Sequence, residues 1–556
     1  MSTERFDRNN LGLSRSPYLL QHADNPVWWQ EWSRETVDEA ARRGVPIFVS
    51  SGYATCHWCH VMAAGAFSDR DTADLLNRNF VCVKVDREER PDIDHYLMEF
   101  INMQNGSGGW PLNAFITPDL RPFLSFTYLP AETERGMPGL HEVAAQVAEY
   151  YRDQGSAVKA FEPSRSLPEK REPQELIPEL LRMFDARYGG FGMHQKFPPH
   201  CTLLYLLYSL LADDSTDAQT ICRKTLDAMR LGGLHDHLQG GIFRYCVDRE
   251  WKIPHFEKML YDQAMALWCF SLGSEAFPAE RDAFQDMALN IVRCLQECFE
   301  VDGLFLSAFD ADTGHEEGAT YLWDHSELGE ILKQDDFEAL KEVYEIEPGG
   351  NFEGRIHLVK KIDRSLPRIA EKLLETRRSR PQPQADTKIL CGNNALTVIA
   401  LLQAGRLLGV DEYTGKAGRT MGRLLDLFWD GRRLAHSFSG GVLQEQSFLS
   451  DAAPVAAALA MLADVDPGWR SRMEKMLEYI ETFKDPDGWV ESRPDDFHHV
   501  PAGVFDHPVP SSTAMAEFAK ASCALVMGAL AETIDYRRPF VADFFNVTAL
   551  LCRGSS

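Results

Sequence analysis

The chain has 556 residues, more than one hydrophobic core ordinarily serves, so its length predicts two to four domains. It is 44% hydrophobic and 25% charged, which is typical of a folded globular protein and excludes a disordered chain. The formal net charge of −26, without a long basic run, argues against nucleic acid as a partner. No apolar stretch of about 18 residues is present, and residues 1–10 lack the apolar core of a secretory signal, so we expect a cytoplasmic protein without membrane partners.

Residues 1 to about 160 mix the periodicities of strands and helices, which predicts an α/β domain. In chain order we expect a helix over 35–43, a buried strand over 45–50, a helix from the CHWCH sequence to about residue 77, a strand over 80–86 and a helix over 91–104. A hairpin of two strands over 112–119 and 122–130 follows.

A polar stretch with three prolines then predicts a linker over residues 161–175. Beyond it helical patterns dominate, near 174–184, 201–212, 217–231, 258–275, 281–298, 325–345, 367–379, 393–408, 413–428, 450–463, 468–483 and 512–533. Paired helices of this kind either close into an α/α barrel or stack into an open solenoid. The lack of a fixed repeat argues mildly against the solenoid.

The Cys56-His57-Trp58-Cys59 motif follows a predicted buried strand and opens a predicted helix. A sulfur at a helix N-terminus lies near free N–H groups and the positive end of the helix dipole, which favours the thiolate. Cys56 is therefore the predicted nucleophile, and Cys59, one turn later, the predicted resolving thiol. Pro111 precedes a predicted strand, where thioredoxin-like folds carry a cis-proline beside the sulfurs. The other cysteines are expected to be reduced and mostly buried.

Three other interpretations of this motif remain open. Cys-x-x-Cys-His is also the attachment pattern of covalent haem, which requires an export route that this N-terminus does not offer. Zinc could use Cys56, Cys59 and His60, but no nearby Cys or His pair completes a tetrahedral set. The third is a thiol pair without turnover, beside the bulky Trp58.

Seven long segments resemble the spermatogenesis-associated protein twenty family and together span nearly the whole chain. They are SPYLLQHADNPVWWQEW (16–32), PIFVSSGYATCHWCHVM (46–62), VKVDREERPDID (83–94), GGWPLNAFITPD (108–119), GGFGMHQKFP (189–198), HDHLQGGIFRYCVDREWKIPHFEKMLYDQA (235–264) and FDAD (309–312). The resemblance implies a multidomain α/β plus all-α protein: an N-terminal thioredoxin-like fold followed by an (α/α)6 barrel similar to six-hairpin glycosidases and N-acylglucosamine 2-epimerases. It implies no settled reaction.

The resulting domain prediction is a thioredoxin-like domain with an N-terminal aromatic leader over 1–160, the linker over 161–175 and the barrel over 176–556. The chain departs from the family pattern mainly in the barrel. The departures are Ala63-Ala64-Gly65-Ala66-Phe67, Asp386-Thr387-Lys388 with Asn393-Asn394-Ala395, and Pro510-Ser511-Ser512-Thr513-Ala514. Sugar chemistry is therefore less strongly indicated than dithiol chemistry.

Glycoside hydrolysis and epimerisation both need polar groups that converge in a cavity. The richest cluster in the barrel segment comprises Asp236, His237, Arg244, Tyr245, His255, Glu257, Lys258, Tyr261 and Asp262, with Asp310 and Asp312 further along. The same residues have structural interpretations of equal weight: Glu257 and Lys258 as an ion pair, the histidines as core residues with satisfied hydrogen bonds, and the two later aspartates as caps.

Two N-terminal segments also have structural interpretations. The aromatic leader, which includes Tyr18 and Trp29, is most simply a clasp that packs the N-terminus onto the domain. The charge run over 86–90 is expected to be solvated, or else to position a substrate, because it follows a strand end.

The sequence thus favours thiol-disulfide oxidoreductase-like activity at Cys56 and Cys59, acting on a protein thiol or a small molecule. One alternative is a carbohydrate-active epimerase or hydrolase that uses the barrel cluster. Another is a non-catalytic binding protein. We expect no metal, and no organic cofactor either, because the chain has no glycine-rich phosphate loop after a strand.

Overall fold

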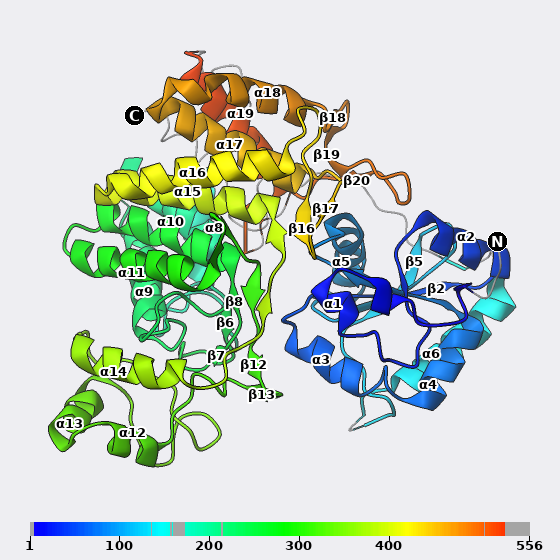
Figure 1. Cartoon of the computed structure of the whole chain (residues 1–556), viewed down its shortest axis with the longest axis horizontal. Helices are drawn as coiled ribbons and strands as arrows, with labels where there is room; N and C mark the ends of the chain where they lie inside the picture. The colour runs from blue at the N-terminus through cyan, green and yellow to red at the C-terminus, as the bar shows by residue number, and fades with distance from the viewer. Residues whose placement is uncertain are drawn as a thin grey trace.

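The computed structural model describes residues 5–134, 136–155, 158–159, 173–212, 215–504, 506 and 508–528. They form an α/β part, blue to cyan in Figure 1, beside a larger helical part, green to red. Residues 161–172 of the predicted linker and 529–533 of the last predicted helix lie outside the described residues. No helix in the described part is long and apolar enough to cross a membrane.

A five-stranded sheet organises the α/β part, in the order β1 (Gln30–Glu31), β3 (Val81–Asp86), β2 (Ile47–Gly52), β4 (Leu112–Ile116) and β5 (Pro122–Phe126). The β1, β3 and β2 strands run parallel, whereas β4 is antiparallel to both of its neighbours. The central strands are buried along their whole length because helices cover both faces. The helical segments of this part are η2 (Leu11–Leu13), α1 (Pro17–Leu20), α2 (Arg34–Arg43), α3 (His57–Ala64), α4 (Arg70–Asn79), α5 (Pro91–Asn105) and α6 (Leu140–Gln154).

The helix predicted from CHWCH to residue 77 is in fact two helices, so this prediction was wrong. The α3 helix ends at Gly65, and α4 begins after Asp69, whose carboxylate accepts a hydrogen bond from the Thr72 backbone N–H at 2.8 Å. An N-cap of this kind satisfies an otherwise unpaired donor and starts a new helix.

The helical part alternates inner and outer helices. The inner helices are α8 (His200–Ala212), α10 (Leu260–Ala276), α15 (Cys391–Leu408), α17 (Leu449–Val465) and α19 (Ser512–Val526), and each packs against the next. The outer helices are α7 (Pro173–Met183), α9 (Thr216–Leu231), α11 (Arg281–Cys294), α16 (Asp411–Phe428) and α18 (Arg470–Glu481). Inner helices such as α10 are buried on every side, whereas outer ones bury a single face. This alternation is the α/α barrel, so the predicted fold class is confirmed.

A smaller lobe extends from the barrel and contains α12 (His325–Ile331), α13 (Gln334–Val343) and α14 (Pro367–Arg378). The sequence predicted one helix over 325–345, which was wrong, because Leu332 adopts an extended backbone and is buried between α12 and α13. Two further short helices in the described part are the π-helix η4 (Leu295–Phe299) and the 3-10 helix η5 (Pro467–Trp469).

Short strands connect the barrel helices, and several lie on the side that faces the α/β part (Figure 1). They are β6 (Tyr245–Cys246), β7 (Pro254–His255), β8 (Lys258–Met259), β9 (Glu300–Val301), β10 (Leu304–Phe305), β11 (Ala308–Phe309), β12 (Asp312–Thr313), β13 (Glu316–Glu317), β14 (Ala385–Asp386), β15 (Ile389–Leu390), β16 (Ser437–Ser439), β17 (Val442–Gln444), β18 (Lys484–Asp485), β19 (Gly488–Ser492) and β20 (Val500–Pro501). The barrel side chains that meet the CHWC motif lie on these strands or directly beside them.

Candidate functional site

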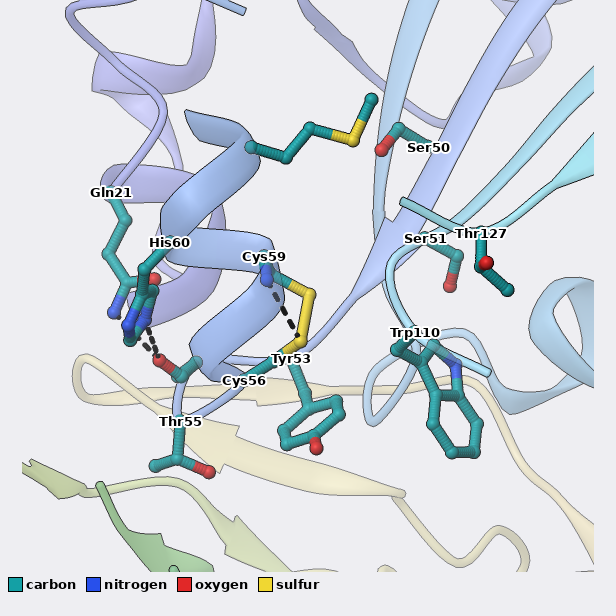
Figure 2. The surroundings of a disulfide bond; sticks show 12 residues. Gln21, Ser50, Ser51, Tyr53, Thr55, Cys56, Cys59, His60, Trp110 and Thr127 are labelled. Carbon is teal, nitrogen blue, oxygen red and sulfur yellow. Dashed lines mark hydrogen bonds between the residues drawn. A yellow bond between two sulfur atoms is a disulfide. The ribbon is translucent and has the colours of Figure 1, made fainter. Parts of the chain in front are cut away.

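The CHWC motif lies where β2 ends and α3 begins. Cys56 is the N-cap residue of α3, and its sulfur accepts a hydrogen bond from the Cys59 backbone N–H at 3.2 Å. The two cysteines form a disulfide with their Cα atoms 5.2 Å apart (Figure 2). Both are buried, with 3% and 1% of their surface exposed. The first sulfur thus lies at the helix N-terminus, where N–H groups and the dipole stabilise a thiolate.

Pro111 follows a cis peptide bond and directly precedes β4. Because β4 pairs with β2, with Leu112 opposite Ser51, the cis-proline lies beside the end of the strand that leads to the motif. The preceding Trp110 donates its indole N–H to Asp94 at 2.9 Å and meets the Tyr53 ring edge-to-face. Figure 2 shows Trp110 and Tyr53 on the same side of the disulfide.

Cys59 has a buried neighbour, Tyr18, that sequence reasoning assigned only to packing. A side chain at Gly52 would overlap both the Tyr18 hydroxyl and the Cys59 sulfur. Both atoms therefore border the same small space next to Gly52. Tyr18 is fully buried, and its hydroxyl has no hydrogen-bond partner among the described residues. Burial, with a contribution from Asp86, raises the pKa of Tyr18 well above its usual value, so the phenol remains a proton donor.

The barrel contacts the residues just before the motif. Glu257 is fully buried and accepts hydrogen bonds from the Thr55 hydroxyl and, at 3.5 Å, from the Tyr53 hydroxyl. Arg244 pairs with the same carboxylate at 2.8 Å and also donates to Tyr53. This contact was not predictable from sequence, because Thr55 and Glu257 are 202 residues apart.

The barrel also contacts the residues within and after the motif. Asp312 lies 3.1 Å from Nδ1 of His57 and 3.8 Å from Nδ1 of His60. The hydrogen bond to Asp312 raises the pKa of His57, and the two histidines hold the pKa of Asp312 well below its usual range despite partial burial. Asp310 is 3.9 Å from His60 and is buried, which raises the pKa of its carboxyl to about 6.

His60, Asp310 and Asp312 place one possible metal ligand each within 4.8 Å of one another. However, Nε2 of His60 lies 2.8 Å from the Ala54 carbonyl, and His57 already engages Asp312. The carboxylates therefore have imidazole partners, and the cysteines of the zinc hypothesis are joined to each other. We assign no metal to this cluster.

The structure divides the predicted barrel cluster into three groups. Glu257, His255, Asp310 and Asp312 face the CHWC motif; His255 bonds Glu317 through Nδ1 at 2.6 Å and lies 3.5 Å from Glu257 through Nε2. Tyr261 and Asp262 instead line a cavity between the two domains.

The third group lies away from both places. Asp236 forms a buried ion-pair network with Lys258 at 2.7 Å and Arg377 at 2.9 Å. His237 bonds the Gly232 carbonyl, and burial lowers its pKa well below the usual value, which leaves a neutral core histidine. Asp236, His237 and Lys258 do not line the interdomain cavity.

The interdomain cavity has a volume of about 1130 Å³. Its wall combines Arg87, Asp94 and Trp110 of the α/β part with residues of the barrel. On the barrel side the Tyr261 hydroxyl and Oδ2 of Asp262 are buried and lack hydrogen-bond partners among the described residues. The size suits a small organic ligand.

The charge run over 86–90 is largely buried, so its expected solvation was wrong. Asp86 and Glu88 meet Lys388 of the barrel at 2.7 and 3.1 Å, and Lys388 also pairs with Asp386 at 2.9 Å. Lys388 is fully buried. Sequence reasoning noted Asp386 and Lys388 only as a departure from a family pattern.

A second interdomain contact predicts a pH dependence of stability. His436 bonds Asp451 through Nδ1 at 2.6 Å and the Glu88 carbonyl through Nε2 at 2.5 Å. Burial lowers its pKa, but Asp451 and the carbonyl outweigh burial and raise it to about 9. This stabilisation is fully present below the unfolded pKa of about 6.5 and is lost as the pH rises through about 9. We expect the free energy of unfolding, measured with urea, to fall between pH 7 and pH 9. The same measurement on a His436→Gln variant should give a flatter dependence on pH. Equal pH dependence in the two proteins would contradict the assignment.

Comparisons with known proteins found a matching family model, curated relatives and similar solved structures. A family model named Thioredox_DsbH and described as "Protein of unknown function, DUF255" matches residues 8–166. Spermatogenesis-associated protein 20 of Rattus norvegicus is 33% identical over 539 residues, covering 83% of this chain and 68% of the rat protein. The Homo sapiens protein of the same name is 32% identical over 544 residues, covering 84% and 69%. A solved sugar epimerase from a ruminal bacterium is similar at 12% identity with a TM-score of 0.32, covering 64% of this chain and 96% of that one.

The chain is therefore a two-part protein in which a thioredoxin-like domain with a CHWC disulfide docks onto an α/α barrel. It belongs to the spermatogenesis-associated protein 20 family.

Proposed function

We propose that this protein is a thiol-disulfide oxidoreductase that uses Cys56 as nucleophile and Cys59 as resolving thiol, acting on a protein thiol or a small molecule in the cytoplasm. The observation that carries the proposal is the position of Cys56 as the N-cap of α3. Pro111 supports it, because this residue directly precedes β4 and lies beside the end of β2 that leads to the motif. Together they provide an activated sulfur and an extended backbone along which a substrate can lie.

In the reduced protein, the Cys56 thiolate attacks one sulfur of a substrate disulfide and releases the other sulfur as a thiolate, which takes up a proton. Cys59 then loses its proton to solvent, and its thiolate attacks the Cys56 sulfur of the mixed disulfide. The Cys56–Cys59 bond forms and the second substrate sulfur leaves and is protonated. The substrate disulfide is thereby reduced to two thiols and the protein pair is oxidised.

Replacing Cys56 with Ser tests the proposal. We expect the variant to lose exchange with a small disulfide such as oxidised glutathione, because serine cannot form the mixed disulfide. A Cys82→Ser variant is the matched control, because Cys82 is a buried free cysteine of β3. Undiminished exchange in Cys56→Ser, measured by mass spectrometry of alkylated protein, would overturn the proposal.

Tyr18 is expected to assist the second step. Its hydroxyl lies beside Cys59 and can donate a hydrogen bond to the Cys59 thiolate, which is otherwise costly in a buried position. A Tyr18→Phe variant should resolve the mixed disulfide about ten-fold more slowly, since a hydrogen bond to a charged group contributes roughly 1.5–3 kcal/mol. Rapid acid quench and mass spectrometry measure the decay of the mixed disulfide. Tyr150→Phe, at an exposed tyrosine of α6, serves as control, and an equal decay in both variants would refute the role.

A second proposal concerns the interdomain cavity, which we infer takes a carbohydrate. The Tyr261 hydroxyl and Oδ2 of Asp262, which lack partners among the described residues, support it, because a donor and an acceptor placed together in this way can bind sugar hydroxyls and move protons. Burial raises the pKa of Asp262, which favours a role as acid. A binding screen of monosaccharides and disaccharides with folded protein tests it, and the absence of any hit would rule it out.

A further inference from the structure

The interdomain cavity contains many charged groups, and most of them are already engaged within the protein. Glu88 pairs with Lys388, Asp451 with His436 and Arg244 with Glu257. One oxygen of Asp262 lies 3.4 Å from His200. The other carboxylates accept hydrogen bonds from uncharged donors: Asp94 from Ser51 and Trp110, Glu491 from the Ser450 backbone N–H, and Asp506 from the Ser511 backbone N–H.

Arg87 differs from these groups. Its guanidinium lies 3.9 Å from the Trp110 ring centroid and 5.2 Å from that of Tyr53, so it is held over two aromatic faces. Among the described residues, no carboxylate lies within salt-bridge distance of it. Stacking leaves the N–H donors of a guanidinium free to bind in its plane. Arg87 therefore presents a positive charge on the cavity wall with no direct ion pair, although carboxylates such as Asp94 and Glu88 act on it from beyond salt-bridge distance.

Two further polar groups on the same wall lack partners. The Tyr261 hydroxyl and Oδ2 of Asp262 belong to side chains that are 5% and 2% exposed. Both side chains line the same cavity as Arg87 and Arg244. Buried polar groups are nearly always paired in folded proteins, so a donor and an acceptor left open in the same cavity as a guanidinium without a direct ion pair indicate a ligand that completes them.

We propose that this cavity binds a polyhydroxylated small molecule that carries one anionic group, such as a sugar acid or a sugar phosphate. The anionic group pairs with Arg87, and ligand hydroxyls bond Tyr261 and Asp262. A guanidinium suits both carboxylate and phosphate because it offers paired N–H donors. This inference rests on the proposal that the cavity takes a carbohydrate, and it adds the charge of the ligand and the residue that selects it.

Calorimetric titration of the full chain provides the test, with D-glucuronate, D-glucose 6-phosphate, D-glucose, acetate and inorganic phosphate as probes. We expect one of the two anionic sugars to bind at least about ten-fold more tightly than glucose, and the preferred one identifies the anionic group. Arg87→Met should reduce that affinity to the level of glucose, and Arg87→Lys should retain part of it. Arg432→Met, at an exposed arginine outside the cavity, should leave it unchanged.

The outcomes separate the inference from the carbohydrate proposal. Equal affinity for glucose and the anionic sugars, or an unchanged affinity in Arg87→Met, overturns the inference and leaves the carbohydrate proposal standing. Acetate or phosphate binding as tightly as the sugars supports the Arg87 site and overturns the carbohydrate proposal. Absence of binding by every probe overturns both.

A second measurement applies if Arg87→Met does not fold. The wild-type affinity for the anionic sugar should then fall with added NaCl while the affinity for glucose does not, because salt screens the ion pair alone. Tyr261→Phe should weaken both sugars by similar factors. A salt-independent affinity for the anionic sugar would overturn the inference.

Discussion

Replacement of Lys388 with Met is expected to lower the free energy of unfolding by about 3–5 kcal/mol, the cost of removing one partner of a buried ion pair. Lys388 is fully buried and is the cation that faces Asp86, Glu88 and Asp386. Without it, carboxylates from both domains would face one another in a space that excludes water. Urea unfolding at pH 8 measures the loss.

The pH dependence of that loss identifies its cause. The pKa of Glu88 is already raised to about 7, mainly by burial, and loss of Lys388 should raise it further. The loss of unfolding free energy in Lys388→Met should therefore become smaller as the pH falls from 8 to 5, because protonation of the carboxylates removes their repulsion. Lys341→Met removes an exposed pair with Glu338 and should cost less than about 1 kcal/mol. A Lys388→Met deficit as small as this, or one independent of pH, would contradict the assignment.

Replacement of Glu257 with Ala is expected to accelerate alkylation of reduced Cys56 by iodoacetamide at least about ten-fold. Barrel contacts hold the loop before the motif through Thr55 and Tyr53, and the cysteines behind it are almost fully buried. Hydrogen bonds to a charged group contribute roughly 1.5–3 kcal/mol each, so their loss should make opening of this contact correspondingly easier. A reagent would then reach Cys56 more often.

Two variants keep this experiment interpretable. Thr55→Val removes one contact to Glu257 without leaving Arg244 unpaired, and it should accelerate alkylation in the same direction by a smaller factor. Glu316→Gln alters an exposed carboxylate of β13 and should have no effect. If neither Glu257→Ala nor Thr55→Val changes the rate, then the barrel does not restrict access to the dithiol.

Local patterns predicted most of the helices and the position of the dithiol at a helix N-terminus. The predicted helices over 201–212, 217–231 and 393–408 correspond to α8, α9 and α15 within two residues at each end. Where local patterns failed, at residue 65 and residue 332, a cap or a buried turn interrupted a continuous apolar period. Capping depends on a few atoms, which a periodicity averaged over several turns does not register.

The barrel cluster shows the limit of sequence proximity. Eleven predicted site residues between 236 and 312 suggested one convergent site, yet Asp236 and Lys258 pair with each other away from the cavity. Glu257 and Tyr261 lie in different places, one against the motif and one on the cavity wall. Residues on short strands and loops point in directions that only the closed barrel determines.

The sequence by itself determined the two kinds of domain, the helical hairpins and the position of Cys56 at a helix N-terminus, because these depend on periodicity and on neighbours a few residues apart. The tertiary structure decided which groups surround the dithiol and which line the cavity. Asp86 and Lys388 meet although 302 residues separate them, and burial turns an apparently solvated charge run into an interdomain network. Desolvation and pairing act through space, so their consequences for charge and reactivity follow only from the packed domains.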